Sequence, residues 1–328
     1  MMKIVLSTGN SLGAAAASYN SSLSQKSNLE LVQSLRVNIE DAIRDTLPQT
    51  NGNGTHTDLA KKKFDWKRWT SLQEDGKVLY VPAIDFSQSS LQEEREQYDI
   101  TVKLFYLRST PAFQREKYTR EALDLVLKEL HMPSVDLLIV SFPGIYFDEE
   151  TEDCPDKIKS RGPIEVEPES LEAQIETWEV LQKLVDEGLV KKLGLAEFGA
   201  ERLTPLLEKT RIPPAVDQIN LRDCCSVPKT LLSLAKSKDV ELLVHNDCTN
   251  VLPRGTVREL LGQGENGAGI LSGGESVGEK RKSRDDDKIP GGISGEVVPQ
   301  WVVKYTAVVS NRGVVENKGY FAVAEVQT

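Results

Sequence analysis

Three polar residues follow the apolar run LLV in the stretch VELLVHNDC, at positions 240–248. His245, Asn246 and Asp247 stand where a buried strand would end at the rim of a site. A histidine titrates near neutral pH, so this cluster could do acid-base chemistry. A histidine at a strand end is more often a hydrogen-bonding partner of its neighbours, and both interpretations remain open.

A lysine inside an apolar strand pattern is the second candidate. In the stretch ITVKLFYL, alternation places Lys103 on the same side as Thr101 and Phe105. If that side faces the interior, the ammonium group needs a counter-charge or a lowered pKa, which is typical of present or former catalytic lysines. The alternative is a solvated lysine.

The cysteines could provide metal or redox chemistry. Cys224 and Cys225 are vicinal, and Cys248 would lie at the same rim if the strands that precede them are neighbours. No CxxC pair is present, and vicinal cysteines chelate one tetrahedral ion poorly, so we expect no metal site. With Cys154 they lack the spacing of a disulfide framework, which favours a reducing compartment.

Composition narrows the class of partner. The net charge is −10 and the basic residues are scattered, so neither a nucleic-acid partner nor a membrane surface is expected. The opening MMKIVLSTGNSLGAAAASYN has too short an apolar run for a signal peptide or a membrane span, which predicts a cytoplasmic location. No GxGxxG, GxxxxGK[ST], GxSxG or HExxH motif points to a nucleotide cradle or a hydrolase.

The elements that must position these residues alternate between short apolar segments and segments of helical periodicity. The clearest helix covers residues 168–187, with Pro168 in its first turn and Gly188 at its end, and a second covers 29–47. Strands that alternate with helices predict an α/β fold, and eight such units predict a (β/α)8 TIM-type barrel, with an open doubly wound sheet as the alternative. The expected strands are 3–7, 78–84, 100–107, 135–141, 190–195, 215–221, 240–245 and 307–315.

One domain is expected over residues 1–328, interrupted by polar segments. Residues 49–76 carry an NGNG turn and a Lys-rich, Trp-containing patch, which indicates a polar insertion. Residues 262–295 contain ten glycines in 34 residues and the charge run EKRKSRDDDK, so we expect a disordered loop there.

In a barrel, functional side chains project from the C-terminal ends of the strands. That rule adds Ser141, Glu197 and Gln218 to Lys103 and to the rim at 245–247.

Four segments, in order, resemble the strands of the aldo-keto reductase family. The resemblance covers roughly residues 100–251 and 297–320, and it implies a barrel of the aldo-keto reductase kind. The segments are VDLLIVSFP (135–143), EGLVKKLGLAEF (187–198), VDQINL (216–221) and QWVVKYTAVVSNRGVV (300–315), of which the last resembles the final helix and strand of the family.

The resemblance implies an incomplete catalytic set. The family uses an Asp, a Tyr, a Lys and a His to protonate a carbonyl oxygen while a nicotinamide donates hydride. Lys103 matches the lysine, whereas Ser141 stands at the position of the histidine. Asp85 could serve as the aspartate, but Ser90 occupies the position of the proton-donating tyrosine. No catalytic residue is therefore expected, and Lys103 and Ser141 are vestigial.

The cofactor contacts are altered as well. Gln218 matches one of three residues that hold the nicotinamide carboxamide, but Ala196-Glu197 replaces the Ser-Asn pair. The phosphate-gripping segment becomes VENK at 315–318, which places a carboxylate where a phosphate would lie. The resemblance thus implies no bound cofactor, with NADP as the alternative and with Gln218 and Glu197 as vestigial contacts.

Further segments resemble the modifier subunits of glutamate-cysteine ligase, a divergent branch of that superfamily. They are LSTGN at the start, INLRDCCSVP, ELLVHND and SNRGVVENKGYF. The resemblance implies a non-catalytic regulatory subunit that binds the catalytic subunit of the ligase as a heterodimer, raises its affinity for glutamate and relieves feedback inhibition by glutathione. Rim or interface candidates are then Cys224, Cys225, His245, Asn246 and Asp247. The alternatives are an NADP-dependent oxidoreductase of the aldo-keto reductase type with a rearranged active site, and a scaffold barrel unrelated to the ligase.

Overall fold

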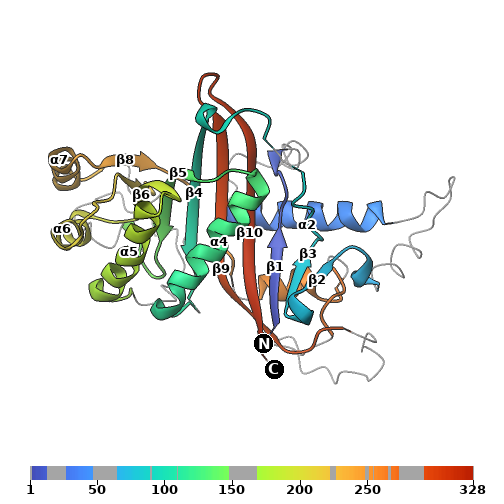
Figure 1. Ribbon diagram of the computed structural model, residues 1–328. Helices are drawn as coiled ribbons and strands as arrows, with labels where there is room; N and C mark the ends of the chain where they lie inside the picture. The colour runs from blue at the N-terminus through green and yellow to red at the C-terminus, as the bar shows by residue number, and fades with distance from the viewer. Residues whose placement is uncertain are drawn as a thin grey trace.

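A computed structural model describes eleven segments of the chain: 2–12, 27–46, 65–88, 91–108, 110–147, 168–221, 227–247, 251–253, 255–264, 267–272 and 292–327. Within them, ten strands form one mixed sheet in the order β2-β3-β1-β10-β9-β4-β5-β6-β7-β8 (Figure 1). The two ends of the described chain lie close together at one end of the sheet.

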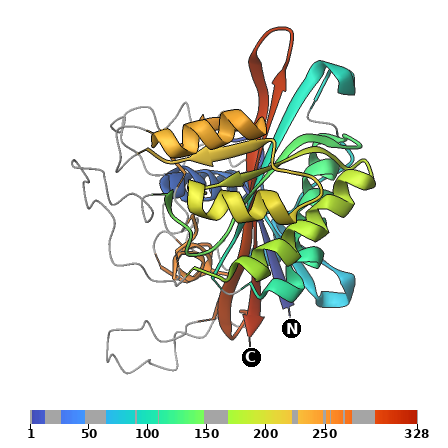
Figure 2. The same ribbon diagram turned by 90° about the vertical axis from the view of Figure 1, so that its left-hand side faces the viewer.

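Five parallel strands form one half of the sheet. They are β4 (Tyr98–Tyr106), β5 (Val135–Ser141), β6 (Val190–Ala196), β7 (Val216–Ile219) and β8 (Glu241–Val244). The crossover helices α4 (Arg115–Leu130), α5 (Leu171–Asp186), α6 (Ala200–Lys209) and α7 (Lys229–Lys238) cover its outer face (Figure 2). The predicted alternation of strand and helix is confirmed in this half.

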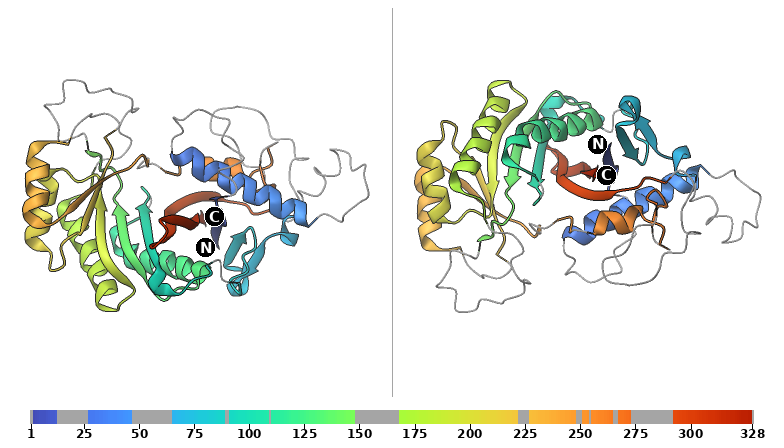
Figure 3. Two further views of the ribbon diagram at one scale, coloured as in Figure 1. Left: turned by 90° about the horizontal axis from the view of Figure 1, so that it is seen from above. Right: turned by 90° about the horizontal axis from the view of Figure 1, so that it is seen from below.

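The other half is built on a long hairpin. Strands β9 (Glu296–Val309) and β10 (Val314–Gln327) pair with each other, with β4 and with β1 (Met2–Ser7), antiparallel in all three cases. Strand β3 (Val78–Val81) lies parallel to β1, and β2 (Ser71–Gln73) forms the edge. Helices α2 (Ser27–Asp45) and α8 (Thr256–Leu261) cover this half on the opposite face from α4 (Figure 3). Short 3-10 turns complete the elements: η1 (Trp66–Arg68), η2 (Glu74–Gly76), η3 (Arg95–Gln97) and η4 (Ala112–Gln114).

The helices form close to where the sequence predicts them, but α5 begins at Leu171, so Pro168 precedes the helix and does not lie in its first turn. The α5 stripe buries Trp178, Leu181 and Leu184, and the Ser170 hydroxyl caps its first turn by accepting from the Ala173 backbone N–H at 3.3 Å. The chain leaves α5 through Gly188, whose φ of 76° favours glycine. No helix in the described segments combines the length and hydrophobicity needed to cross a membrane.

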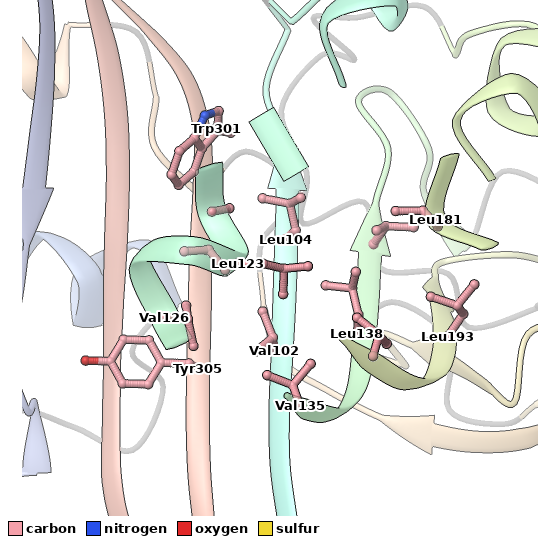
Figure 4. Packing of buried hydrophobic residues seen from close by; sticks show 14 of the residues in the cluster. Val102, Leu104, Leu123, Val126, Val135, Leu138, Leu181, Leu193, Trp301 and Tyr305 are labelled. Atoms are coloured by element: carbon pink, nitrogen blue, oxygen red, sulfur yellow. The ribbon is translucent and has the colours of Figure 1, made fainter. Parts of the chain in front are cut away.

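The two largest cores lie on the two faces of the sheet, because alternate strand residues point to opposite sides. On the outer face, Val102 and Leu104 of β4 pack between Trp301 and Tyr305 of β9 and Leu138 of β5 (Figure 4). On the inner face, a second core joins β1, β3, β9 and β10 to α2 and α8.

The expected strand at 307–315 is wrong. Residues 310–313 form a turn, with Gly313 at a φ of 62°, and two strands of 14 residues flank it. The stretch that resembles a final helix is therefore the strand β9, because WVVKYTAVV is rich in β-branched residues that alternate between the two faces. The hairpin lies between β1 and β4, where the expected barrel has no strands.

The parallel strands β4 to β8 nevertheless form a curved sheet, as the strands of a (β/α)8 barrel do. In a flat sheet, β4 and β8 would lie roughly 19 Å apart, four strand spacings. Yet Lys103 of β4 hydrogen-bonds to Gln218 of β7 and to Asp247, three residues after β8. The expected α/β fold with barrel curvature is confirmed, and we call the curved strands β4 to β8 the arc.

Parts of the two expected loops pack against the core. Trp66 and Trp69 of the insertion at 49–76 are buried, while residues 49–64 lie outside the described segments. In the loop at 262–295, Ile270 and Leu271 are buried and their N–H groups donate to the Leu261 carbonyl, so disorder is wrong for residues 267–272. Their apolar AGIL run explains the difference. Disorder at 273–291, outside the described segments, stays a prediction.

Candidate functional site

The site lies on the concave face of the arc, at its carboxyl end. Lys103 projects from the middle of β4 with 4% of its surface exposed, as the alternation predicts. Its Nζ donates to Asp247 Oδ2 at 3.0 Å and to Gln218 Oε1 at 2.9 Å. Three residues that the sequence selects separately therefore meet.

A second lysine, which the sequence analysis missed, binds the same carboxylate. Lys304 of β9 lies directly opposite Lys103 in the β4–β9 register, and its Nζ donates to Asp247 Oδ1 at 2.9 Å. Strand alternation in WVVKYTAVV could have found it, because Lys304 shares a side with Val302 of the inner core. The expectation of a helix there hid that signal.

His245 links Asp247 to Glu197. Its Nδ1 accepts the Asp247 backbone N–H at 3.0 Å, which places the ring proton on Nε2. Nε2 lies 2.8 Å from Glu197 Oε1, but the two atoms are poorly aligned for a hydrogen bond. Glu197 Oε2 accepts the Phe147 backbone N–H at 3.0 Å. Glu197 also has a φ of 70°, a left-handed conformation that is costly for this residue type.

The electrostatics follow from burial and from the paired charges. Burial lowers the pKa of Lys103, and the attraction of Asp247 and Glu197 opposes that effect. Burial alone would raise the pKa of Asp247, but Lys103, Lys304 and His245 hold it well below its usual range. The cluster thus brings two lysines together with the acidic side chains of Asp247 and Glu197.

The remaining sequence candidates fall in different places. Asn246 is exposed, whereas His245 and Asp247 on either side of it turn inward. Ser141 is buried at the end of β5, two residues beyond Ile139, which is the partner of Lys103 in the register. The four cysteines lie outside the described segments. Among the described residues, no group of three His, Cys, Asp or Glu side chains has the arrangement of a metal site.

The aspartate that the resemblance suggests is remote from Lys103. Asp85 is exposed after β3, and β1, β10 and β9 separate β3 from β4. A hydrogen bond from Ser87 lowers the pKa of Asp85, and Ser90 lies outside the described segments. Asp247 instead supplies the counter-charge of Lys103.

A tyrosine does approach the cluster, from β10. Lys304 Nζ lies 5.8 Å from the centre of the Tyr320 ring. Tyr320 is 1% exposed, and burial, Glu30 and Asp247 raise the pKa of its hydroxyl far above the usual value. Such a hydroxyl is the opposite of a proton donor whose pKa a lysine lowers.

Comparison with known proteins assigns the sequence to a family. The sequence pattern of the aldo/keto reductase family matches residues 53–251, more than half of the chain. The chain belongs to the aldo/keto reductase family.

One class of relative is similar to this chain over most of its length. The human glutamate-cysteine ligase regulatory subunit is 25% identical over 286 residues, 86% of this chain and 88% of that protein. A Schizosaccharomyces pombe protein, provisionally named as a glutamate-cysteine ligase regulatory subunit, is 27% identical to this chain over 299 residues. These residues are 90% of this chain and 87% of that protein. Human aldo-keto reductase family 1 member C4 is 31% identical, but over 41% of this chain and 40% of its own. Among solved structures, the aldose reductase of Schistosoma japonicum is 28% identical and covers 45% of this chain and 46% of its own, with a TM-score of 0.34.

The residues of this family member do not fit a nicotinamide dinucleotide. Gln218, the one matching carboxamide contact, is held by Lys103, and the Glu197 carboxylate is held by Phe147. The segment at 315–318 begins beside the exposed hairpin turn, where Glu316 accepts from the Tyr98 hydroxyl at 2.8 Å. These contacts belong to the fold of the chain itself.

Proposed function

We propose that this member of the aldo/keto reductase family is a non-catalytic regulatory subunit of glutamate-cysteine ligase. In this proposal it binds the catalytic subunit, raises its affinity for glutamate and relieves feedback inhibition by glutathione. The observation that carries the proposal is coverage: the relatives named as regulatory subunits match 86–90% of this chain, whereas the reductase relative matches 41%. The shared sequence therefore extends well beyond the segment that the reductases share.

The site supports a role without chemistry. A general acid must lie near the reacting group and have a pKa close to the working pH. Asp247 neutralises Lys103, and the Tyr320 hydroxyl is buried with a raised pKa. The cluster therefore supports the fold rather than a proton transfer.

The location and the interface are part of the same proposal. A cytoplasmic location fits four cysteines without a disulfide spacing. Of the rim candidates in the described segments, Asn246 alone is exposed, so it is the rim residue available to a partner. Cys224 and Cys225 remain interface candidates outside the described segments.

Reconstitution with the catalytic subunit tests the proposal. We expect a single heterodimer peak in gel filtration at micromolar concentration, a lower Michaelis constant for glutamate and a higher inhibition constant for glutathione. A regulator acts through a coupling free energy of about 1 to 3 kcal/mol, so each constant should shift several-fold. Two separate peaks together with unchanged ligase kinetics would refute the proposal.

One alternative keeps a specific observation in its favour. Lys103 and Gln218 match reductase positions and both lie on the concave face of the arc, so an NADP-dependent reductase with a rearranged site is the second candidate. Oxidation of NADPH by the purified chain distinguishes the two.

A further inference from the structure

The last strand of the arc has little to hold it. Among the described residues, β8 pairs only with β7, along four residues. Val244, its last residue, is 61% exposed. A short edge strand with one partner belongs to the least stable part of a sheet, where local opening begins.

Asp247, three residues after β8, has a hydrogen-bond partner at each of its four polar atoms. The Asp247 carboxylate binds Lys103 of β4 and Lys304 of β9. Its backbone carbonyl accepts from Asn220 Nδ2 at 3.3 Å, and its N–H donates to His245 Nδ1. The end of β8 is thereby tied to the far side of the arc.

The charges make this connection selective for a carboxylate. The Lys103 and Asp247 side chains are 5% and 9% exposed, so both ions have lost most of their water. Without Asp247, two ammonium groups would face each other on neighbouring strands, and the buried Lys103 would lose its ion-pair partner and keep only the attraction of Glu197.

We propose that Lys103, Lys304 and Asp247 form a clasp that closes the arc at its carboxyl end. In a closed barrel, backbone hydrogen bonds join the last strand to the first; here side-chain ion pairs join the end of β8 to β4 and β9. The chain beyond the clasp continues to Val251 and Leu252, which are buried in the inner core with α8. The clasp therefore also fixes the point where the chain passes from the arc to the hairpin half.

Loss of the clasp should have a local effect on the fold. Opening at Asp247 releases β8 and the rim while β4 and β5 remain paired, because β4 is held independently by β9 along nine residue pairs. The released unit is local, and the rim around Asn246 is a fixed surface only while the clasp is closed.

Hydrogen exchange of the full chain tests the clasp. In Asp247→Asn, which keeps the side-chain shape, we expect the amides of 241–247 to exchange at least about tenfold faster, while those of β5 change by less than about twofold. The control is Asp41→Asn, which removes a carboxylate from the exposed Arg44 pair on α2 and should leave β8 unchanged. Unchanged exchange at 241–247, or equal acceleration in every strand, would overturn the proposal.

Two further variants keep the test decisive if Asp247→Asn folds poorly. Lys304→Met removes one ion pair of the clasp and leaves the more buried pair of Lys103 and Asp247 intact, so we expect about threefold acceleration at β8, less than in Asp247→Asn. An unchanged rate would exclude Lys304 from the clasp. The double variant Lys103→Met/Asp247→Asn removes the unpaired buried charge without restoring the connection. We therefore expect its thermal stability to exceed that of Asp247→Asn while β8 still exchanges fast. If β8 exchange returns to the wild-type rate, the effect belongs to the buried charge and the clasp is refuted.

Discussion

Lys103 and Lys304 face each other across the antiparallel pair of β4 and β9, and a single carboxylate, that of Asp247, separates their charges. Like charges opposite each other on neighbouring strands destabilise a sheet. Their persistence here depends on a residue that follows a strand at the other end of the arc.

Acid should weaken this arrangement in a defined direction. The pKa of Asp247 is lower in the folded chain than the value of about 3.9 in the unfolded chain, so its stabilising contribution is complete above that value and is lost as the pH falls toward the folded value. We expect the difference in unfolding free energy between wild type and Asp247→Asn to be constant from pH 7 to about pH 5 and to shrink below about pH 4. Urea unfolding at each pH measures it, and a difference that grows on acidification would contradict the assignment.

The purified chain should not oxidise NADPH above background with aldehydes, ketones or quinones. Gln218 is held by Lys103, and the Tyr320 hydroxyl is buried with a raised pKa. Absorbance of NADPH at steady state checks this, with Lys103→Met as the control. Turnover in wild type that disappears in Lys103→Met would establish a reductase instead.

A buried arginine between α4 and α5 should contribute strongly to the stability of the fold. Arg115 is fully buried, donates to Thr177 Oγ1 at 3.1 Å, pairs with Glu169 and lies 5.0 Å from the centre of the Tyr106 ring. We expect Arg115→Ala to lower the unfolding free energy by about 3 kcal/mol, because Glu169 loses its partner and a buried space opens. Arg115→Lys should recover only part of it, since an ammonium cannot stack or bind in two directions as a guanidinium does. Chemical denaturation compares the three proteins, and full recovery by lysine would show that charge alone is needed.

The segment at 273–291 should be replaceable by a short Gly-Ser linker. Its ends are already adjacent, because the Ser272 backbone N–H donates to the Ile293 carbonyl at 2.9 Å. Closure entropy changes slowly with loop length, so we expect a change in unfolding free energy within about 1 kcal/mol. Deleting all of 262–295 instead removes the buried Ile270 and Leu271 and should cost several times more. Equal melting temperatures for the two deletions would contradict the packing of 267–272.

The sequence by itself determined the local features of the fold, namely the side of a strand that a residue faces and the approximate positions of helices and strand ends. Period-two alternation placed Lys103 inside the fold, helical periodicity placed α2 and α5, and the end of the apolar run placed His245, Asn246 and Asp247 at a strand terminus. These signals are local, because the side a residue faces depends on its nearest neighbours along the chain.

Only the tertiary structure decided which of these residues meet. The partner of Lys103 is Asp247, 144 positions away, and not Asp85, because the β9–β10 hairpin separates β3 from β4. Lys304 joined the cluster for the same reason, since its strand carries no local sign of which strands it will pair with. Strand order is set by the summed burial of two opposite faces and by backbone pairing over hundreds of residues, which no short window of sequence contains.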